Sequence, residues 1–170
     1  MAKKPKRATD AITVLKDDHK KVKALLASLE KTTERGAERR TKLLQQIEAE
    51  INVHATIEEE IFYPAYREAV KKKDDIELYR EALEEHHVVD LVMPELKASD
   101  PAGEIFGAKA TVLKELIEHH AGEEEKEMFK KARAAMDKAE LLDLGSRMLE
   151  RKKQLKAAGS PREGQARRRS

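Results

Sequence analysis

Residues 54–59 read His-Ala-Thr-Ile-Glu-Glu and lie in a long stretch whose apolar residues recur at helical spacing. A histidine and a glutamate four residues apart lie one turn apart on the same face of a helix. His54 and Glu58 can therefore reach the same metal ion. The spacing recurs at His120 and Glu124, and one lone histidine precedes each pair, His19 in the first case and His86 in the second.

The composition favours a helical protein of one domain. The chain has 170 residues, no cysteine, no tryptophan and only seven glycines, and it is long enough to bury a core. The lack of cysteine excludes disulfides, thiolate metal sites and a cysteine nucleophile. No apolar stretch approaches the roughly 20 residues that cross a membrane. The basic start lacks the apolar segment of a secretory signal, so we expect a cytoplasmic protein.

Five segments show the periodicity of amphipathic helices. We expect four long helices over residues 9–32, 37–72, 75–98 and 102–136, and a shorter one over 138–156. Short connections between such helices favour an antiparallel up-down-up-down bundle. The predicted fold is therefore all-α, with a four-helix bundle over residues 9–136 and an additional helix over 137–156. Residues 1–8 and 157–170 are expected to be disordered basic ends.

The four bundle helices would bring the special residues to one level. At 1.5 Å per residue, their distances from the predicted helix ends agree within about one turn. Imidazoles and carboxylates without sulfur suit iron, manganese or zinc, and a metal offsets the cost of burying ionised glutamates. The candidate ligands are His19, His54, Glu58, His86, His120 and Glu124.

Neighbouring residues compete for two of these places. His87 lies about 100° around the helix from His86, so only one of them can point directly inward. We favour His86, because its spacing to the apolar residues that follow matches that of His19. We also favour His120 over His119, and we expect the flanking acids to be solvated, namely Glu59, Glu123 and Glu125.

The order of these residues resembles the hemerythrin-like HHE cation-binding domain: His19, then His54-x-x-x-Glu58, then His86, then His120-x-x-x-Glu124. Residues 18–22 (Asp-His-Lys-Lys-Val) and 85–89 (Glu-His-His-Val-Val) resemble the helices of that family that carry a lone histidine. Residues 58–64 (Glu-Glu-Glu-Ile-Phe-Tyr-Pro) and 124–129 (Glu-Glu-Lys-Glu-Met-Phe) resemble the ends of its second and fourth helices. The resemblance covers about residues 9–136.

The resemblance implies a cofactor of two iron ions in an oxo-bridged non-haem di-iron centre. Glu58 and Glu124 would bridge the ions. One ion would be held by His19 and His54, the other by His86 and His120. Such a centre binds dioxygen or a related small ligand, which would suit a sensor of oxygen, iron or redox state, or a stress protein.

The chain departs from the oxygen-carrying hemerythrins on its third helix. Those proteins have a second histidine one turn before the ligand of this helix, where this chain has Ala82. Asp90, one turn after His86, is a further candidate donor. One ion would thus have an open position, which leaves a di-iron enzyme acting on peroxide or nitric oxide as an alternative.

Charge is distributed unevenly along the chain. The net charge is +4 over residues 1–7, −9 over 8–150 and +7 over 151–170. Basic ends can contact nucleic acid, so a metal-free interaction module with a nucleic-acid-binding tail is a second alternative, although we favour solvated ends. A ferritin-like oxidase would need Glu-x-x-His on two helices, and the chain has this spacing once, from Glu84 to His87.

Overall fold

The computed structural model describes residues 9–159 as a bundle of helices, and these residues contain no strand. The first long helix is α1 (Ala11–Glu30), followed by the short turn η1 (Glu34–Gly36). The second consists of α2 (Ala37–Ile57), the π-helical turn η2 (Glu58–Phe62) and α3 (Tyr63–Ala69). The third is α4 (Lys73–Lys97). The fourth consists of α5 (Glu104–Glu123), the π-helical turn η3 (Glu124–Met128) and α6 (Phe129–Ala135), and α7 (Lys138–Ala158) follows.

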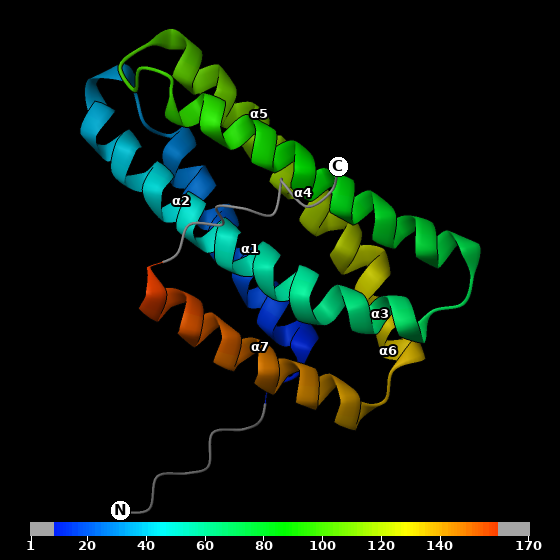
Figure 1. The fold of residues 1–170 in the computed structure, drawn as a ribbon. Helices are drawn as coiled ribbons and strands as arrows, with labels where there is room; N and C mark the ends of the chain where they lie inside the picture. The colour runs from blue at the N-terminus through cyan, green and yellow to red at the C-terminus, as the bar shows by residue number, and fades with distance from the viewer. Residues whose placement is uncertain (1–8, 160–170) are drawn as a thin grey trace, which may run out of the picture.

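The long helices form the expected antiparallel four-helix bundle with an extra C-terminal helix (Figure 1). Helix α1 packs against α2 and α5, and α4 packs against α5 and α2, so the four surround a common core. Helix α7 lies outside this ring, along α1 and α2. The expected disordered N-terminal end, 1–8, lies outside the described residues, as do residues 160–170 of the expected C-terminal end. The prediction that disorder begins at residue 157 was wrong, because α7 continues to Ala158.

The ends of the helices follow from local chemistry. Asp10 is the N-cap residue of α1, and its side chain accepts a hydrogen bond from the backbone N–H of Thr13 at 2.9 Å. Asp137 and Glu140 form a capping box at the start of α7. Gly145 allows α7 to lie close to α1, because a Cβ atom there would be 2.2 Å from the carbonyl oxygen of Thr9.

Two apolar clusters make up the core, and a polar layer separates them. One cluster surrounds Leu15, Phe62 and Tyr66 at one end of the bundle, and the other surrounds Leu26, Ile47 and Leu113 at the opposite end. Along every bundle helix a histidine lies between the residues of the two clusters. Each bundle helix thus contributes to the polar layer through a histidine that interrupts its apolar face.

Candidate metal centre

One histidine from each bundle helix points into the polar layer. The four are buried and come from α1 (His19), α2 (His54), α4 (His86) and α5 (His120). The ring centres of His19 and His54 are 4.8 Å apart, and those of His86 and His120 are 4.7 Å apart. The structure therefore brings the histidines together as two pairs.

Two fully buried glutamates lie between these pairs. Glu58 places Oε1 3.2 Å from Nε2 of His54 and Oε2 3.3 Å from Nε2 of His86. Oε2 of Glu124 lies 3.1 Å from Nε2 of His19 and 3.6 Å from Nε2 of His120. Each carboxylate thus faces one histidine of each pair, which is the placement that a carboxylate bridging two ions requires.

The donor atoms fall into two groups, in each of which the atoms lie within 4.8 Å of one another. The first group, which we call the first position, draws on His19, His54, Glu58 and Glu124. The second group, the second position, draws on Glu58, His86 and His120. Glu58 belongs to both, so the two positions share a carboxylate.

Each histidine also faces an acid through its other ring nitrogen. Nδ1 of His120 lies 2.7 Å from Oε2 of Glu85, and Nδ1 of His54 lies 3.5 Å from Oδ2 of Asp18. Carboxylates in this place fix the ring orientation of a histidine whose Nε2 binds a metal. Similar contacts of 2.9 Å join His19 to Glu125 and His86 to Glu59.

The prediction that Glu59 and Glu125 are solvated neighbours was therefore wrong. The Glu59 side chain is only 14% exposed and the Glu125 side chain 32% exposed, because each turns toward a histidine of an adjacent helix. Glu123 does lie near the surface, where it faces His119 at 3.5 Å. All four orienting acids directly precede or follow a candidate ligand in the sequence, which is the signal that could have identified them.

The charges of the cluster shift its protonation equilibria strongly. Burial alone would lower the pKa of His54, but the negative charges of Glu58 and Asp18 outweigh burial and raise this pKa to about 10. The pKa of His86 is raised to about 9, since the negative charges of Glu58 and Glu59, together with the hydrogen bond to Glu59, outweigh its burial. Burial raises the pKa of Glu58, yet His54 and His86 hold it well below its usual value. The buried carboxylate thus depends on nearby positive charge.

Several inward-facing atoms lack a hydrogen bond. Within residues 9–159, no hydrogen-bond partner is found for Nε2 of His19, Nε2 of His54, both oxygens of Glu58 or Oε2 of Glu124. Buried polar atoms are normally paired, and leaving one unpaired costs about 1–3 kcal/mol. These atoms are nitrogen and oxygen donors that converge, so the residues fit a pair of metal cations.

A tyrosine that the sequence analysis did not single out also enters the layer. Tyr63 is buried and its hydroxyl donates a hydrogen bond to Oε1 of Glu124 at 2.9 Å. The same hydroxyl lies 3.4 Å from Nε2 of His86. Burial and the charges of Glu124 and Glu58 raise the pKa of Tyr63 well above its usual value. In the metal-free site the phenol is therefore neutral.

The π-helical turns explain why Tyr63 was missed. The backbone N–H of Tyr63 donates to the carbonyl of Glu58, five residues earlier, instead of four as in an α-helix. The turn therefore brings residue 63 round toward the face of Glu58. The equivalent turn η3 joins Phe129 to Glu124 in the same way. Pro64 follows η2, but the residue at the equivalent place after η3 is Lys130, so a proline is not needed for the turn.

The competing histidines lie outside the layer. His87 is exposed, and the His119 side chain is 64% exposed. Because Glu123 follows His119 by four residues, spacing alone does not separate His119 from His120, and burial does. Ala82 is buried in the apolar cluster next to the layer. Asp90 is half-buried and is not among the donors that converge at the two positions within residues 9–159.

A small cavity adjoins the four histidines. Its volume is about 20 Å³, and apolar side chains from all four bundle helices complete its wall, namely Val22, Ile51, Ala55, Val89, Ile117 and Ala121. A space of this size holds about one water-sized molecule. It is therefore suited to a ligand of one or two heavy atoms.

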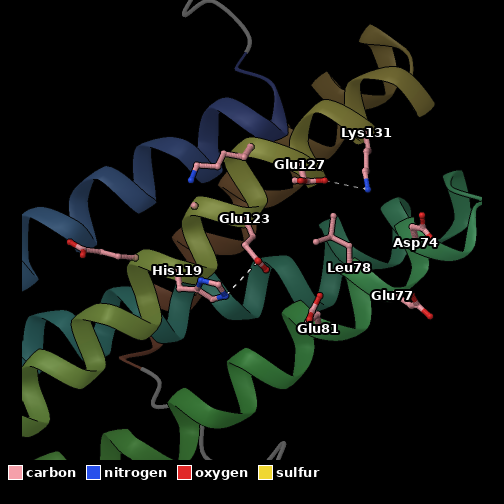
Figure 2. A pocket seen from close by; sticks show the side chains of 11 residues that line it. Asp74, Glu77, Leu78, Glu81, His119, Glu123, Glu127 and Lys131 are labelled. Atoms are coloured by element: carbon pink, nitrogen blue, oxygen red, sulfur yellow. Dashed lines mark ion pairs between the residues drawn. The ribbon is translucent and has the colours of Figure 1, made fainter.

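A much larger hollow lies on the outer surface between α4 and the α5–α6 helix (Figure 2). Its volume is about 590 Å³, and its wall is mainly acidic, with His119 and Glu123 at one end and Lys131 at the other. His119 and Glu123 of this wall lie close to Glu85, which does not line the hollow, and all three are partly or largely exposed. Solvent satisfies such groups, so the hollow differs in kind from the buried layer.

Within residues 9–159 no helix is both long enough and apolar enough to span a bilayer.

Two known proteins are similar to this chain in structure or sequence. A hemerythrin HHE cation binding domain-containing protein from Mycobacterium kansasii superposes with a TM-score of 0.77 at 26% identity, covering 88% of this chain and 89% of that one. A protein named DNA nickase from Nostoc sp. (strain PCC 7120) is 28% identical over 116 residues, or 68% of this chain. The chain spans only 31% of the length of that relative.

The family model described as Hemerythrin HHE cation binding domain matches residues 10–132. This range contains all six candidate ligands, both π-helical turns and all four orienting acids. The chain belongs to the hemerythrin HHE cation-binding domain family.

Proposed function

We propose that the chain holds two iron ions at its two positions and binds dioxygen or a related small molecule there. His19 and His54 would hold the ion at the first position, and His86 and His120 the ion at the second. Glu58 and Glu124 would bridge the two. The observation that carries the proposal is the set of converging buried donor atoms that lack hydrogen bonds.

The chain's own residues have three tasks in such a site. The acids at Nδ1, such as Glu85 behind His120, hold each ring with Nε2 inward. The two apolar clusters exclude water from the layer. The cavity of about 20 Å³ beside the histidines limits the ligand to a small molecule. When bound, the iron would supply redox chemistry and open coordination positions.

Metal analysis of protein produced with iron tests the proposal most directly. We expect about two irons per chain in the wild type, by analogy with two-ion carboxylate sites in helix bundles. Glu58→Gln and Glu124→Gln should each lose most of this iron, because the bridge loses an anionic oxygen. Glu38→Gln is the matched control, since the Glu38 side chain is 82% exposed. Wild-type protein without iron, or variants that retain it fully, would overturn the proposal.

Spectra recorded with and without oxygen test the ligand. Reduced protein exposed to dioxygen should change its visible absorption, and the change should reverse when oxygen is removed if the protein is a carrier or sensor. A spectrum unaffected by dioxygen would exclude this ligand and leave nitric oxide and peroxide to be tested in the same way.

Turnover of peroxide is the second candidate. The observation that favours it is the Tyr63 hydroxyl, a proton donor beside the second position. Peroxide consumption by the iron-loaded protein that falls at least tenfold in Tyr63→Phe would support the enzyme. Consumption that persists after the metal is removed would show that the site is not responsible.

A further inference from the structure

The acids that orient the histidines repeat with an approximate two-fold symmetry. Asp18 directly precedes a candidate ligand in α1 and faces His54 of α2. Glu85 directly precedes a candidate ligand in α4 and faces His120 of α5. The acids that directly follow the two bridging glutamates form the second equivalent pair, and each again faces a histidine of an adjacent helix. The two positions therefore match in their histidines and in the acids behind them.

Two lysines contact the acids behind the histidines of the first position. Lys152 of α7 donates a hydrogen bond to Oδ1 of Asp18. Nζ of Lys23 lies 3.4 Å from Oε1 of Glu125, the acid behind His19. The Lys152 and Lys23 side chains are 15% and 33% exposed, so water screens their charges only in part. Behind both histidines of the first position, a lysine thus partly offsets the charge of the carboxylate.

A residue of opposite charge occupies the place that corresponds to Lys23 in the other half. Lys23 follows His19 by four residues in α1, and Asp90 follows His86 by four residues in α4. Residues four apart share a helix face, so Asp90 lies one turn beyond His86, where it is half-buried. This place therefore carries an ammonium group beside the first position and a carboxylate beside the second.

Helix α7 adds a further charge to one half of the layer. It packs along α1 and α2, the helices that carry the histidines of the first position. Asp18 receives Lys152 from this helix. The equivalent acid, Glu85, is contacted instead by His119 of α5, with 3.3 Å between Oε1 and Nε2. Both differences place more positive charge at the first position than at the second.

Charge behind a histidine affects the iron that the histidine would bind. A carboxylate at Nδ1 makes the imidazole a more basic ligand, and a lysine that shares the carboxylate weakens this effect. A positive charge close to the ion also favours the ferrous state, because ferrous iron carries one positive charge less than ferric iron. Both lysines would therefore raise the reduction potential of iron at the first position.

We propose, on the basis of the di-iron function above, that Lys23 and Lys152 make the first position the one that is reduced first. A soluble one-electron donor loses one electron, and the ferric ion at the first position gains it and becomes ferrous. The ion at the second position stays ferric, because Asp90 and the acids behind its histidines favour the higher charge. The second electron enters the second position at a lower potential.

A redox titration of the iron-loaded protein with a viologen mediator tests the order of reduction. We expect two one-electron steps, and the half-reduced form between them, which has an odd number of electrons, should be detected by electron paramagnetic resonance. Lys23→Met and Lys152→Met should each lower the potential of the first step. At the wild-type midpoint of that step, the ratio of ferrous to ferric iron should fall by about tenfold. Asp90→Asn should raise the potential of the second step instead.

Matched variants separate this role from a general effect of charge or of folding. Lys20→Met and Lys153→Met remove the same charge from exposed positions of the same two helices and should leave both steps nearly unchanged. Lys152→Arg keeps the charge and should restore the first step. Lys23 is more exposed than Lys152, so its variant keeps the test decisive if Lys152→Met does not fold.

Two results would overturn the inference. One is a single two-electron step in the wild type, and the other is a first step that moves no further in Lys23→Met and Lys152→Met than in the exposed controls. Either result, obtained with two irons per chain, would leave the proposed function standing. Absence of iron would overturn both, so the two failures are distinguishable.

Discussion

Lys152 of α7 donates a hydrogen bond to Oδ1 of Asp18, in the first helix of the bundle. The other oxygen of this carboxylate faces Nδ1 of His54 at 3.5 Å. A helix that lies outside the four-helix bundle therefore reaches the polar layer through one intermediate side chain. Arg151 reinforces the attachment with two hydrogen bonds to Glu60, of 2.7 and 3.0 Å.

Replacing Lys152 should destabilise the metal-free protein. The Lys152 and Asp18 side chains are only 15% and 9% exposed, so Lys152→Met leaves a largely buried carboxylate without its lysine. We expect the free energy of unfolding to fall by about 1–3 kcal/mol in urea titrations. Lys153→Met, at the exposed next residue, is the control. Equal stability of the two variants would contradict the role given to Lys152.

Asp18 should affect metal affinity more than its neighbour does. Asp18→Asn removes the negative charge that orients His54, and losses of this kind typically weaken metal binding by about 10- to 100-fold. Asp17→Asn changes the same charge at an exposed position one residue earlier. Competition with a chelator measures both affinities. A loss of the same size in Asp17→Asn would mean that only the overall charge matters.

Stability of the metal-free protein should depend on pH in a direction set by the histidines. The pKa of His54 is raised from 6.5 to about 10. The contribution of His54 to the free energy of unfolding is therefore fully present below pH 6.5 and is lost as the pH rises through 10. His86 loses its contribution as the pH rises through about 9. The lowered pKa of Glu58 gives a contribution that is present above pH 4.5 and is lost as the pH falls further.

The melting temperature of chelator-treated protein should therefore be highest between about pH 4.5 and 6.5 and should fall toward pH 9–10. The iron-loaded protein should not show this alkaline decline, because a metal binds the histidines in their neutral form. Melting curves of both forms across the range measure the difference. A melting temperature of the metal-free protein that rises between pH 6.5 and 9 would contradict the assigned shifts.

Two glycines should respond to alanine in opposite directions. Gly145→Ala places a methyl group against the backbone of Thr9, so it should lower the free energy of unfolding by about 1–3 kcal/mol. Gly122 lies in α5, and a Cβ atom there meets no neighbouring atom within 4 Å. Gly122→Ala should raise stability by about 0.5–1 kcal/mol. Denaturant titrations of the Gly145→Ala and Gly122→Ala variants under one condition test the close approach of α7 and α1.

The fold and the convergence of the six candidate ligands could both be predicted from the sequence, because both depend on regular α-helical spacing. His54 and Glu58 share a face whatever the partner helix does. The preference for His86 over His87 followed from the apolar residues around them, and burial of His86 agrees with it. These features need only the period of a single helix.

The orienting acids and Tyr63 depend on more than one helix. Glu59 meets His86 only because η2 and α4 are adjacent in a particular register. Tyr63 reaches the layer only because of a π-helical turn, which no residue type in the sequence specifies by itself. The spacing of residues along the sequence indicates which of them share a helix face. It does not indicate contacts between two helices, because these depend on how the helices are rotated relative to each other.

The two π-helical turns also change the rotation of their helices between one end of the bundle and the other. Each turn holds one residue more than the helix would otherwise need, and one residue rotates an α-helix by about 100°. Tyr66 beyond η2 and Ala132 beyond η3 are buried in spite of this added rotation. Deleting a single residue from η2 would therefore turn the apolar face of α3 toward water while leaving His54 in place. The inserted residue is what allows one continuous helix both to carry a ligand pair and to complete the core beyond it.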